Sequence, residues 1–294
     1  MSAAAALEDF LAQSRGLVEP ALDGWLPTEA QAGPLAAAMR HIACAGGKRL
    51  RPALVLLGNR HVGGRPEQAL GAAVAVELVH AYSLVHDDLP CMDDAQLRRG
   101  RPCVHVLWGE GMAVLAGDGL LTLAFEVLAA HTPRECPVGT MVAALGEAAG
   151  WAGMVGGQVE DLAAEGQAPE LERVRRIHLG KTAAMMGVSL RLGALSGGAS
   201  AADAKALAGV GRDFGLAFQI VDDLLDVQGT TAELGKAAGA DAERAKMTWP
   251  AVAGVERSWR DARQLVAGAL AGAPPGACGP LLEALGATIV PRRS

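Results

Sequence analysis

The chain has 294 residues, 51% of them hydrophobic and 20% charged, which is the composition of a globular protein with enough length for a substantial core. The 26 Lys and Arg residues and 32 Asp and Glu residues give a formal net charge of −6. Because there is no basic excess, we expect no nucleic acid partner. Ala and Leu dominate over aromatic residues, which favours helices over sheet.

The sequence predicts an all-α fold with a single helical domain over residues 1–294. No strand alternation, fixed-period repeat or long polar linker interrupts the helical pattern. Breakers such as "GGKRLRP", "TPRECP" and "APPG" separate many of the helices. In chain order, the helices are expected at residues 4–14, 34–44, 50–62, 67–88, 110–131, 138–164, 170–179, 181–196, 202–227, 231–236, 241–254, 256–272 and 279–290.

Three features bear on location. The N-terminal "MSAAAALEDF" lacks a basic start, so we expect no secretory signal. The five cysteines form no CxxC pair and indicate reduced thiols in a cytoplasmic protein. Residues 69–86 are apolar, but they contain Glu77 and two histidines and end on aspartates. We therefore expect a buried core helix there and no membrane span.

The first charged group along the chain is basic. "GGKRLRP" places Lys48, Arg49 and Arg51 between a flexible glycine pair and a proline. Arg side chains can bind phosphate oxygens through two parallel hydrogen bonds. Taken singly, such cations are more often solvated surface charges, so this group gains meaning only from its neighbours.

The helix predicted at 67–88 runs straight into four aspartates in "HDDLPCMDD", residues 86–94. Two carboxylates about 4 Å apart repel by roughly 4 kcal/mol at an effective dielectric constant of ~20. Asp87 and Asp93 are six residues apart and would not share a face of one straight helix. Pro90 disfavours a straight continuation, so we expect a turn that brings both carboxylates to one ion. Arg98 and Arg99 follow in "LRRGRP".

A second acidic cluster lies downstream in "FQIVDDLLDV", with Asp222, Asp223 and Asp226. Asp222 and Asp226 are four residues apart and lie on one face of a helix, and Gln219 lies one turn earlier. The neighbouring residues are apolar, unlike those of a solvated charged face. A surface acid pair would explain either cluster alone, but two such clusters inside apolar helices make that alternative much weaker.

Hard oxygen ligands without His or Cys suit Mg²⁺, which binds through one or two carboxylates together with substrate phosphates and waters. We therefore expect facing carboxylate walls with a magnesium-bound diphosphate between them. Further cations follow at Lys181, Lys236 and Lys246. His80 lies seven residues before Asp87, almost beneath it on a helix, and fits either a core residue or a site residue.

Together these segments resemble the trans-isoprenyl diphosphate synthase family, and most closely its bacterial farnesyl diphosphate synthases. The motifs that carry the resemblance are, in order, "GGKRLRP", "HAYSLVHDDLPCMDDAQLRRGRPCVH", "AGDGLLTLAFEVL", "GGQVEDL", "GKTAAM", "GLAFQIVDDLLDV", "LGK" and "RAKMTWP". The resemblance implies a helical bundle around a deep central cavity, a homodimer, isopentenyl and allylic diphosphate substrates, and Mg²⁺, with three ions per active site when diphosphate is bound.

The resemblance also implies residue roles. Asp87, Asp93 and Asp222 would be the principal magnesium ligands, supported by Asp88, Asp223 and Asp226. Lys48, Arg51, His80 and Arg99 would bind isopentenyl diphosphate, and Arg98, Lys181 and Lys246 would contact the allylic diphosphate. Lys236 would be a further diphosphate contact. Thr182 and Gln219 would face the developing allylic cation. "RAKMTWP" departs from relatives at Ala245 and Met247, which makes Lys246 the weakest of these assignments.

In such synthases, bulk just before the first acidic motif limits product length. Tyr82 and Ser83 stand five and four residues before Asp87, and together with the inserted "PC" they resemble synthases that stop at the C15 product. Farnesyl diphosphate is the expected product, with geranylgeranyl or geranyl diphosphate as alternatives. A terpene cyclase would have little use for the basic site in "GGKRLRP", and a non-catalytic synthase subunit would be expected to have lost acids from one motif.

Overall fold

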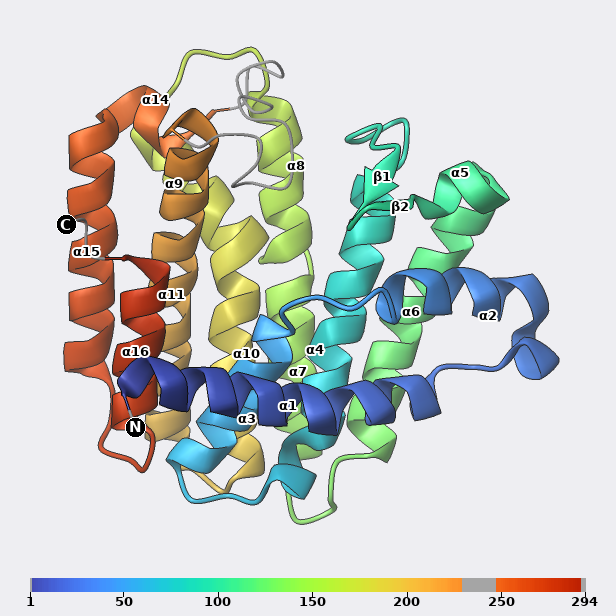
Figure 1. Ribbon diagram of the computed structural model, residues 1–294, viewed down its shortest axis with the longest axis horizontal. Helices are drawn as coiled ribbons and strands as arrows, with labels where there is room; N and C mark the ends of the chain where they lie inside the picture. The colour runs from blue at the N-terminus through green and yellow to red at the C-terminus, as the bar shows by residue number, and fades with distance from the viewer. Residues whose placement is uncertain (1, 229–246, 292–294) are drawn as a thin grey trace.

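The computed structural model describes residues 2–228 and 247–291. Helices and two very short strands make up its elements (Figure 1). They are α1 (Ala3–Trp25), α2 (Glu29–Ala43), α3 (Leu50–His61), α4 (Pro66–Asp87), β1 (Leu97–Arg98), β2 (Arg101–Pro102), α5 (Val104–Trp108), α6 (Glu110–Ala130), α7 (Val138–Ala149), α8 (Met154–Ala164), α9 (Leu171–His178), the π-helical turn η1 (Leu179–Ala183), α10 (Ala184–Ser196), α11 (Ala201–Gln228), α14 (Trp249–Ala253), α15 (Val255–Gly272) and α16 (Gly279–Ile289). The all-α prediction is confirmed, while the single domain over residues 1–294 stays a prediction.

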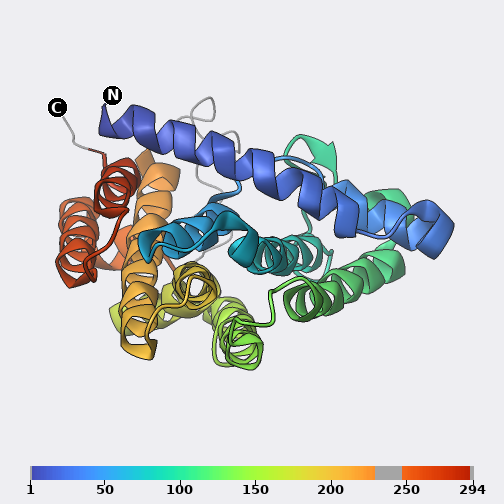
Figure 2. The same cartoon turned by 90° about the horizontal axis from the view of Figure 1, so that it is seen from below.

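Helix α4 forms the centre of the bundle. Its apolar side chains are buried nearly all round, and it packs against α3, α6 and α10. Seen from below in Figure 2, α3 and α6 flank α4, and α1 crosses one side of the bundle. A helix that is apolar on every face needs neighbours on every face, and this explains why the most apolar segment of the chain lies innermost.

Helix α1 is longer than the predicted 4–14. Its buried residues Leu7, Phe10, Ser14, Val18 and Leu22 recur every three or four positions and form one continuous stripe. Pro20 lies on the exposed side of the helix. The buried stripe therefore carries the helix through a residue that sequence reading treats as a breaker.

The segment predicted as one helix at 138–164 is two helices. Gly150 and Gly153 have non-helical backbone angles between α7 and α8. A Cβ built on Gly153 would lie 2.1 Å from the carbonyl oxygen of Ala148, so the bend requires glycine there. The two-residue antiparallel pair β1–β2, in register Leu97 with Pro102, and the short helix α5 were not predicted.

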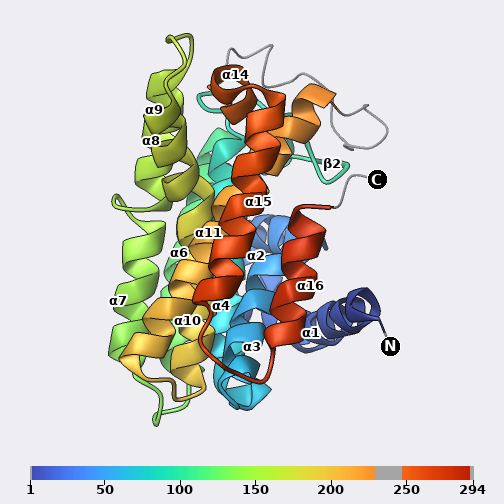
Figure 3. The same cartoon turned by 90° about the vertical axis from the view of Figure 1, so that its left-hand side faces the viewer.

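The two acidic motifs lie at the same end of the bundle. In Figure 1 the C-terminal ends of α4 and α11 both reach its upper end, beside β1 on one side and α9 and α14 on the other. Figure 3 shows the same arrangement from the side. The predicted helix at 231–236 and the first part of the one predicted at 241–254, up to residue 246, lie outside the described residues, and α14 covers residues 249–253 of the second.

Three helical stretches are long and apolar enough to cross a membrane by length and composition alone. The stretch in α4 is 72% buried inside the bundle, which agrees with the predicted core helix. The stretches in α6 and in residues 138–164 are each 39% buried. These two leave apolar side chains uncovered in the single chain.

Candidate active site

The first acidic motif folds back on itself after α4 ends at Asp87. The backbone N–H of Asp93 donates to the carbonyl of Asp87 at 2.8 Å, and that of Ala95 donates to the carbonyl of Asp88 at 3.2 Å. The predicted turn around Pro90 is therefore confirmed. It brings Asp87 and Asp93 close enough for each to affect the other electrostatically.

The carboxylate of Asp88 faces inward. It is 1% exposed and accepts hydrogen bonds from Nε and Nη2 of Arg98 at 2.9 and 2.5 Å. Burial would lower the pKa of Arg98, but the hydrogen bond and charge of Asp88 raise it overall. The structure thus pairs Asp88 with Arg98 inside the protein.

The positive charges near Asp87 do not offset the cost of burying its carboxylate beside other acids. Burial raises its pKa to about 6; Lys181 and Arg98 act to lower the pKa, whereas Asp93 and Asp88 raise it. Two like charges beside a desolvated carboxylate favour either a bound proton or a bound cation. The donor set, oxygen only and rich in carboxylates, fits Mg²⁺.

Lys181 connects this wall to the opposite side of the bundle. Its Nζ donates to Oδ2 of Asp161 at 2.6 Å. Burial would lower the pKa of Lys181, but Asp161, Asp87 and Asp93 raise it overall. Lys181 therefore lies between Asp161 on α8 and the acids at the end of α4, as a cation at a diphosphate site must.

The π-helical turn η1 sets the direction of Lys181 and Thr182. It is inserted between α9 and α10, and single π-turns are frequent at functional sites. Its backbone crosses α8 at close range, because a Cβ on Gly157 would lie 2.2 Å from the amide nitrogen of Lys181. On η1, Thr182 Oγ1 donates to Oε1 of Gln219 at 2.8 Å. The structure thus brings Thr182 and Gln219 together, while their role of facing an allylic cation stays a prediction.

The two adjacent aspartates of the second acidic motif differ in how far they are buried. Asp222 is half-buried, whereas Asp223 and Asp226 are each 3% exposed. Asp223 accepts hydrogen bonds from Gln219 Nε2 at 3.2 Å and from the backbone N–H of Trp249 at 2.8 Å. Its carboxylate also lies 3.3 Å from Nε2 of His178. Asp222, not Asp223, is thus the more accessible acid of the adjacent pair.

The basic residues gather beside His80 on α4. Burial lowers the pKa of His80 well below its usual value, and the charges of Arg51, Arg99, Arg98 and Arg49 lower it further. Burial also lowers the pKa of Arg51, as does the charge of Arg99, while Glu77 raises it. Arg99 donates from Nη1 to the carbonyl of Gly46. Lys48, two residues after Gly46, is exposed. The structure therefore brings the two predicted basic segments together.

Arg49 points away from this group. It is buried, and its Nη1 lies 2.5 Å from Oε1 of Glu77, while Nη2 donates to the carbonyl of Ala43 at 2.8 Å. In the described part of the chain, the non-glycine residues with positive φ are Arg49, Asp94 and Arg99. All three lie in the loops of the site, where strained backbone is often found.

The two residues assigned to product length lie differently. Tyr82 is 6% exposed and packs edge-on against the ring of His86, with ring centroids 5.8 Å apart. Burial raises the pKa of Tyr82 to about 12, with the charge of Asp87 adding to the rise. Ser83 Oγ donates to the carbonyl of His80 at 2.9 Å, so its hydroxyl is turned back onto the helix. Lys236 and Lys246 lie outside the described residues.

Four contributing residues were missed by sequence reasoning: Glu77, Asp161, His178 and Trp249. Glu77 and Asp161 sit within apolar or acidic segments, and nothing in their spacing shows that they pair with Arg49 and Lys181. For Glu77 the available signal is its occurrence as a charged residue within an otherwise apolar helix. Such residues need a partner when buried.

Among residues 2–228 and 247–291, no group of three or more His, Cys, Asp or Glu side chains is close enough to hold a metal ion by itself.

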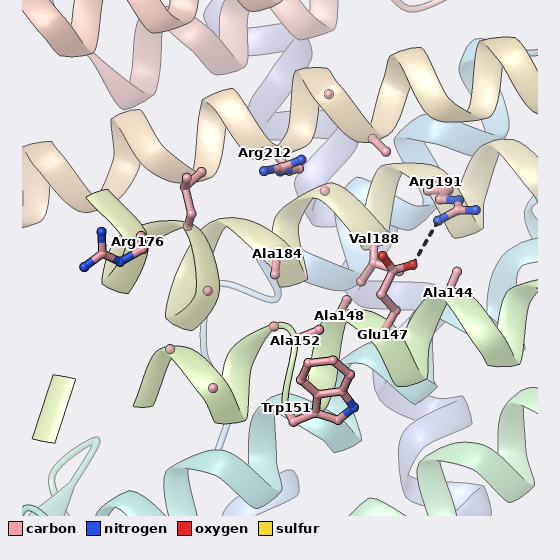
Figure 4. Close-up of a pocket in the computed structure, with 18 of the residues that line it drawn as sticks. Ala144, Glu147, Ala148, Trp151, Ala152, Arg176, Ala184, Val188, Arg191 and Arg212 are labelled. Carbon is pink, nitrogen blue, oxygen red and sulfur yellow. Dashed lines mark ion pairs between the residues drawn. The ribbon is translucent and has the colours of Figure 1, made fainter. Parts of the chain in front are cut away.

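A separate groove of about 820 Å³ lies on the outside of the bundle, between α7 and α8 on one side and α10 and α11 on the other (Figure 4). Its walls carry Arg176, Arg191 and Arg212, and Arg191 pairs with Glu147 at 3.8 Å. Trp151, 87% exposed, stands at its edge. None of the predicted site residues lines it, so this groove is not the cavity expected between the acidic motifs.

Comparison with known proteins agrees with this geometry. Residues 33–275 match the model of the polyprenyl synthetase family. The chain is 47% identical to farnesyl diphosphate synthase of Escherichia coli (strain K12), over 82% of each chain. It is also 47% identical to geranylgeranyl pyrophosphate synthase 12, chloroplastic, of Arabidopsis thaliana, over 78% of this chain, and it spans only 65% of the length of that plant relative.

The fold is shared with solved structures. A geranyltransferase from Helicobacter pylori, complexed with magnesium and isoprenyl diphosphate, is 32% identical with a TM-score of 0.83 over 95% of each chain. The family model extends over the residues that carry the two acidic motifs and the basic loops. The chain therefore belongs to the polyprenyl synthetase family.

Proposed function

We propose that this protein condenses isopentenyl diphosphate head-to-tail with an allylic diphosphate. The observation that carries the proposal is the position of Lys181, a cation between Asp161 and the Asp87–Asp93 pair at the mouth of the helical bundle. Acids and cations in this arrangement suit a diphosphate bound with metal. The relatives are named as farnesyl and geranylgeranyl synthases, and the geranyltransferase structure contains magnesium and isoprenyl diphosphate.

In this proposal, Asp87, Asp93 and Asp222 hold Mg²⁺ against the allylic diphosphate, with Arg98 and Lys181 as further diphosphate contacts. Bound Mg²⁺ supplies positive charge for the leaving group. The allylic C–O bond breaks and its electron pair leaves with the diphosphate. Lys181 bears part of the negative charge that develops there, and removing one such preorganised donor typically lowers the rate roughly 10²–10³-fold.

The basic residues on the other side hold the second substrate. Arg51, Arg99, Lys48 and His80 bind the diphosphate of isopentenyl diphosphate. Its double bond supplies the electron pair for the new C–C bond to the allylic carbon, and the released diphosphate accepts the proton that is then lost. Thr182 and Gln219 present oxygen lone pairs to the cation, and the apolar walls exclude water that would otherwise capture it.

Farnesyl diphosphate is the proposed product, because Tyr82 is a buried aromatic residue five positions before Asp87, where the resemblance implies that bulk limits the length of the product. Geranylgeranyl diphosphate is the second candidate, since synthases of both kinds are 47% identical to this chain. Purified protein with Mg²⁺ and isopentenyl diphosphate is to be given C5, C10 and C15 allylic primers in turn, and the product length measured by mass spectrometry. C15 from the C5 and C10 primers supports the assignment, whereas C20 or C10 as the main product contradicts it.

We further propose a homodimer formed through α6 and α8. Exposed apolar side chains recur at Trp151, just before α8, and at Val155, Val159 and Leu162 on α8, with Val114 and Leu115 exposed on α6. A stripe this long on a single chain indicates a surface covered by protein. A second copy fits, because the resemblance implies a homodimer. Light scattering is expected to give a dimer for the wild type and a monomer for Val155→Asp/Val159→Asp; a monomeric wild type contradicts the proposal.

A further inference from the structure

Both carboxylate oxygens of Asp223 are in contact with other groups of the protein. Oδ1 accepts from Gln219 Nε2 at 3.2 Å, and Oδ2 accepts from the backbone N–H of Trp249 at 2.8 Å. Nε2 of His178 lies 3.3 Å from the same Oδ2. Two hydrogen bonds, from α11 and from the start of α14, and one imidazole nitrogen from α9 thus converge on one buried carboxylate.

His178 is the donor that no motif suggested. It is 5% exposed at the end of α9, directly before η1, and its ring stacks on Trp249 with centroids 5.9 Å apart and planes 22° apart. An ionised carboxylate can only accept hydrogen bonds, so the imidazole nitrogen beside it must carry the hydrogen. This places the ring proton of His178 on Nε2. The stacked ring cannot turn away without losing its packing against Trp249.

The contacts of Asp223 fix the orientation of the Gln219 side-chain amide. Because Gln219 donates from Nε2 to Asp223, its amide oxygen must point the other way, and this oxygen accepts from Thr182 Oγ1 at 2.8 Å. If the amide turned over, its NH₂ group would face Thr182 and Asp223 would lose a donor. The fixed carboxylate therefore decides which end of the Gln219 amide faces the reacting end of the site.

We propose that His178 is a positioning residue that acts through Asp223 to hold the Gln219 amide oxygen and the Thr182 hydroxyl toward the allylic cation. Asp223 serves in this relay as a hydrogen-bond acceptor for the protein, and Asp222 is the acid of that pair that holds the metal. This inference rests on the proposed function. It gives the adjacent aspartates of the second motif different tasks, as their different exposure suggests.

Two His178 variants separate the hydrogen bond from the packing. His178→Gln keeps a donor at the Nε2 position, whereas His178→Phe keeps the ring on Trp249 and removes the donor. We expect His178→Phe to lower kcat roughly 10–100-fold with KM for the allylic diphosphate nearly unchanged, because hydrogen bonds to charged groups have about this value. His178→Gln is expected to stay within about threefold of wild type.

A binding measurement tests the same assignment without turnover. Calorimetric titration of each protein with Mg²⁺ and inorganic pyrophosphate is expected to give nearly wild-type affinity for His178→Phe and Asp223→Asn, but greatly weakened binding for Asp222→Asn. If His178→Phe alone fails to fold, Asp223→Asn carries the kinetic test, with the same expected loss in kcat. Circular dichroism and melting temperature establish folding of each variant.

The outcomes are distinguishable. Wild-type kcat in His178→Phe, an equal loss in His178→Gln, or pyrophosphate binding weakened as much in Asp223→Asn as in Asp222→Asn would each overturn the relay. Failure of the wild-type protein to form any prenyl product would overturn the proposed function instead. A double variant, His178→Phe/Asp223→Asn, is expected to lose no more than the worse single variant, because both changes break the same relay.

Discussion

Lys181 Nζ and Asp161 Oδ2 lie 2.6 Å apart, and this contact ties the π-helical turn to α8 just above the first acidic motif. The charges of Asp161, Asp87 and Asp93 all act on this ammonium group and raise the pKa of Lys181. Without Asp161, the long Lys side chain would be free to pair directly with the acids that the metal needs. The contact therefore keeps the cation and the acids apart until a diphosphate lies between them.

Asp161→Asn is expected to raise both the Mg²⁺ concentration needed for half-maximal activity and KM for the allylic diphosphate, by roughly tenfold or more, because a charge-assisted hydrogen bond is lost. Steady-state rates at varied Mg²⁺ measure this. The neighbouring Glu160 pairs with Arg173 at 3.4 Å and is half-exposed, so Glu160→Gln is the matched control and is expected to behave as wild type. Equal effects of the two substitutions would contradict the role given to Asp161.

The crossing of α8 and η1 depends on glycine. A Cβ at Gly157 would lie 2.2 Å from the amide nitrogen of Lys181 and 2.6 Å from the carbonyl carbon of Gly180. Gly157→Ala is therefore expected to displace the turn that carries Lys181 and Thr182. We predict a destabilisation of roughly 1–3 kcal/mol from overpacking, and a larger fractional loss of kcat than the stability change explains.

Gly146 on α7 is the control for this substitution. No atom lies within 4 Å of the Cβ position of Gly146, so Gly146→Ala is expected to be neutral or to stabilise by about 0.4–1 kcal/mol. Urea denaturation followed by circular dichroism compares the two variants. A Gly157→Ala protein as stable and active as Gly146→Ala would show that the crossing has more room than the structure indicates.

Arg49 and Glu77 form a buried ion pair beneath the basic loop, with side chains 2% and 3% exposed. Removing one partner leaves the other charge buried and unpaired, so Glu77→Ala is expected to destabilise the protein by roughly 3–5 kcal/mol. Denaturant midpoints at neutral pH measure this. Replacing both residues, Arg49→Met/Glu77→Leu, removes both charges together and is expected to recover much of the loss. A further loss in the double variant would contradict the pairing.

The large features of this fold could be predicted from the sequence. The segments predicted at 50–62, 67–88 and 110–131 agree closely with α3, α4 and α6, because apolar residues fill their lengths and breakers flank them. The turn at Pro90 was also predicted correctly, because it depends on local spacing. The hydrogen bond between Thr182 and Gln219 was not predicted, since the resemblance gave the two residues a shared role but no contact.

The contacts that the sequence did not show are long-range. Arg49 looks like another phosphate-binding cation in "GGKRLRP", but the left-handed backbone at this residue turns its side chain inward to Glu77. Asp223 looks like its neighbour Asp222, but it lies one residue further round α11 and so faces His178 and Trp249. One step along a helix rotates a side chain by about 100°, and only the packed bundle decides which of two adjacent acids is buried.

The pKa of Asp87 predicts an unusual dependence of stability on pH. Its folded-state value, about 6, is above the usual 3.8, so the folded protein binds this proton more tightly than the unfolded chain. The stabilisation from the proton is complete below pH 3.8 and is lost as pH rises through 6. In metal-free protein, Asp87→Asn is therefore expected to raise the melting temperature at pH 7.5 and to change it little at pH 4. A variant less stable than wild type at pH 7.5 would contradict this.

A cation bound at the Asp87 carboxylate is expected to stabilise the folded protein at neutral pH. Mg²⁺ with pyrophosphate at pH 7.5 is expected to raise the melting temperature of wild type by several degrees and that of Asp87→Asn much less, because a ligand stabilises the state that binds it. At pH 5, where the carboxyl is mostly protonated, the wild-type shift is expected to shrink. An equal shift in both proteins would place the cation away from Asp87.

Tyr82 is the residue on which the product assignment depends. Its ring is buried at the core side of the first acidic motif, against His86, and its replacement by Ala would open a space of several carbon atoms there. Tyr82→Ala is therefore expected to shift the main product from C15 to C20 or longer, at some loss of stability. Ser83→Ala is the control. Its hydroxyl is turned back to the carbonyl of His80, so the product is expected to stay at C15. Product lengths are compared by mass spectrometry after incubation with the C5 primer. An unchanged C15 product from a folded Tyr82→Ala protein would mean that another side chain closes the site.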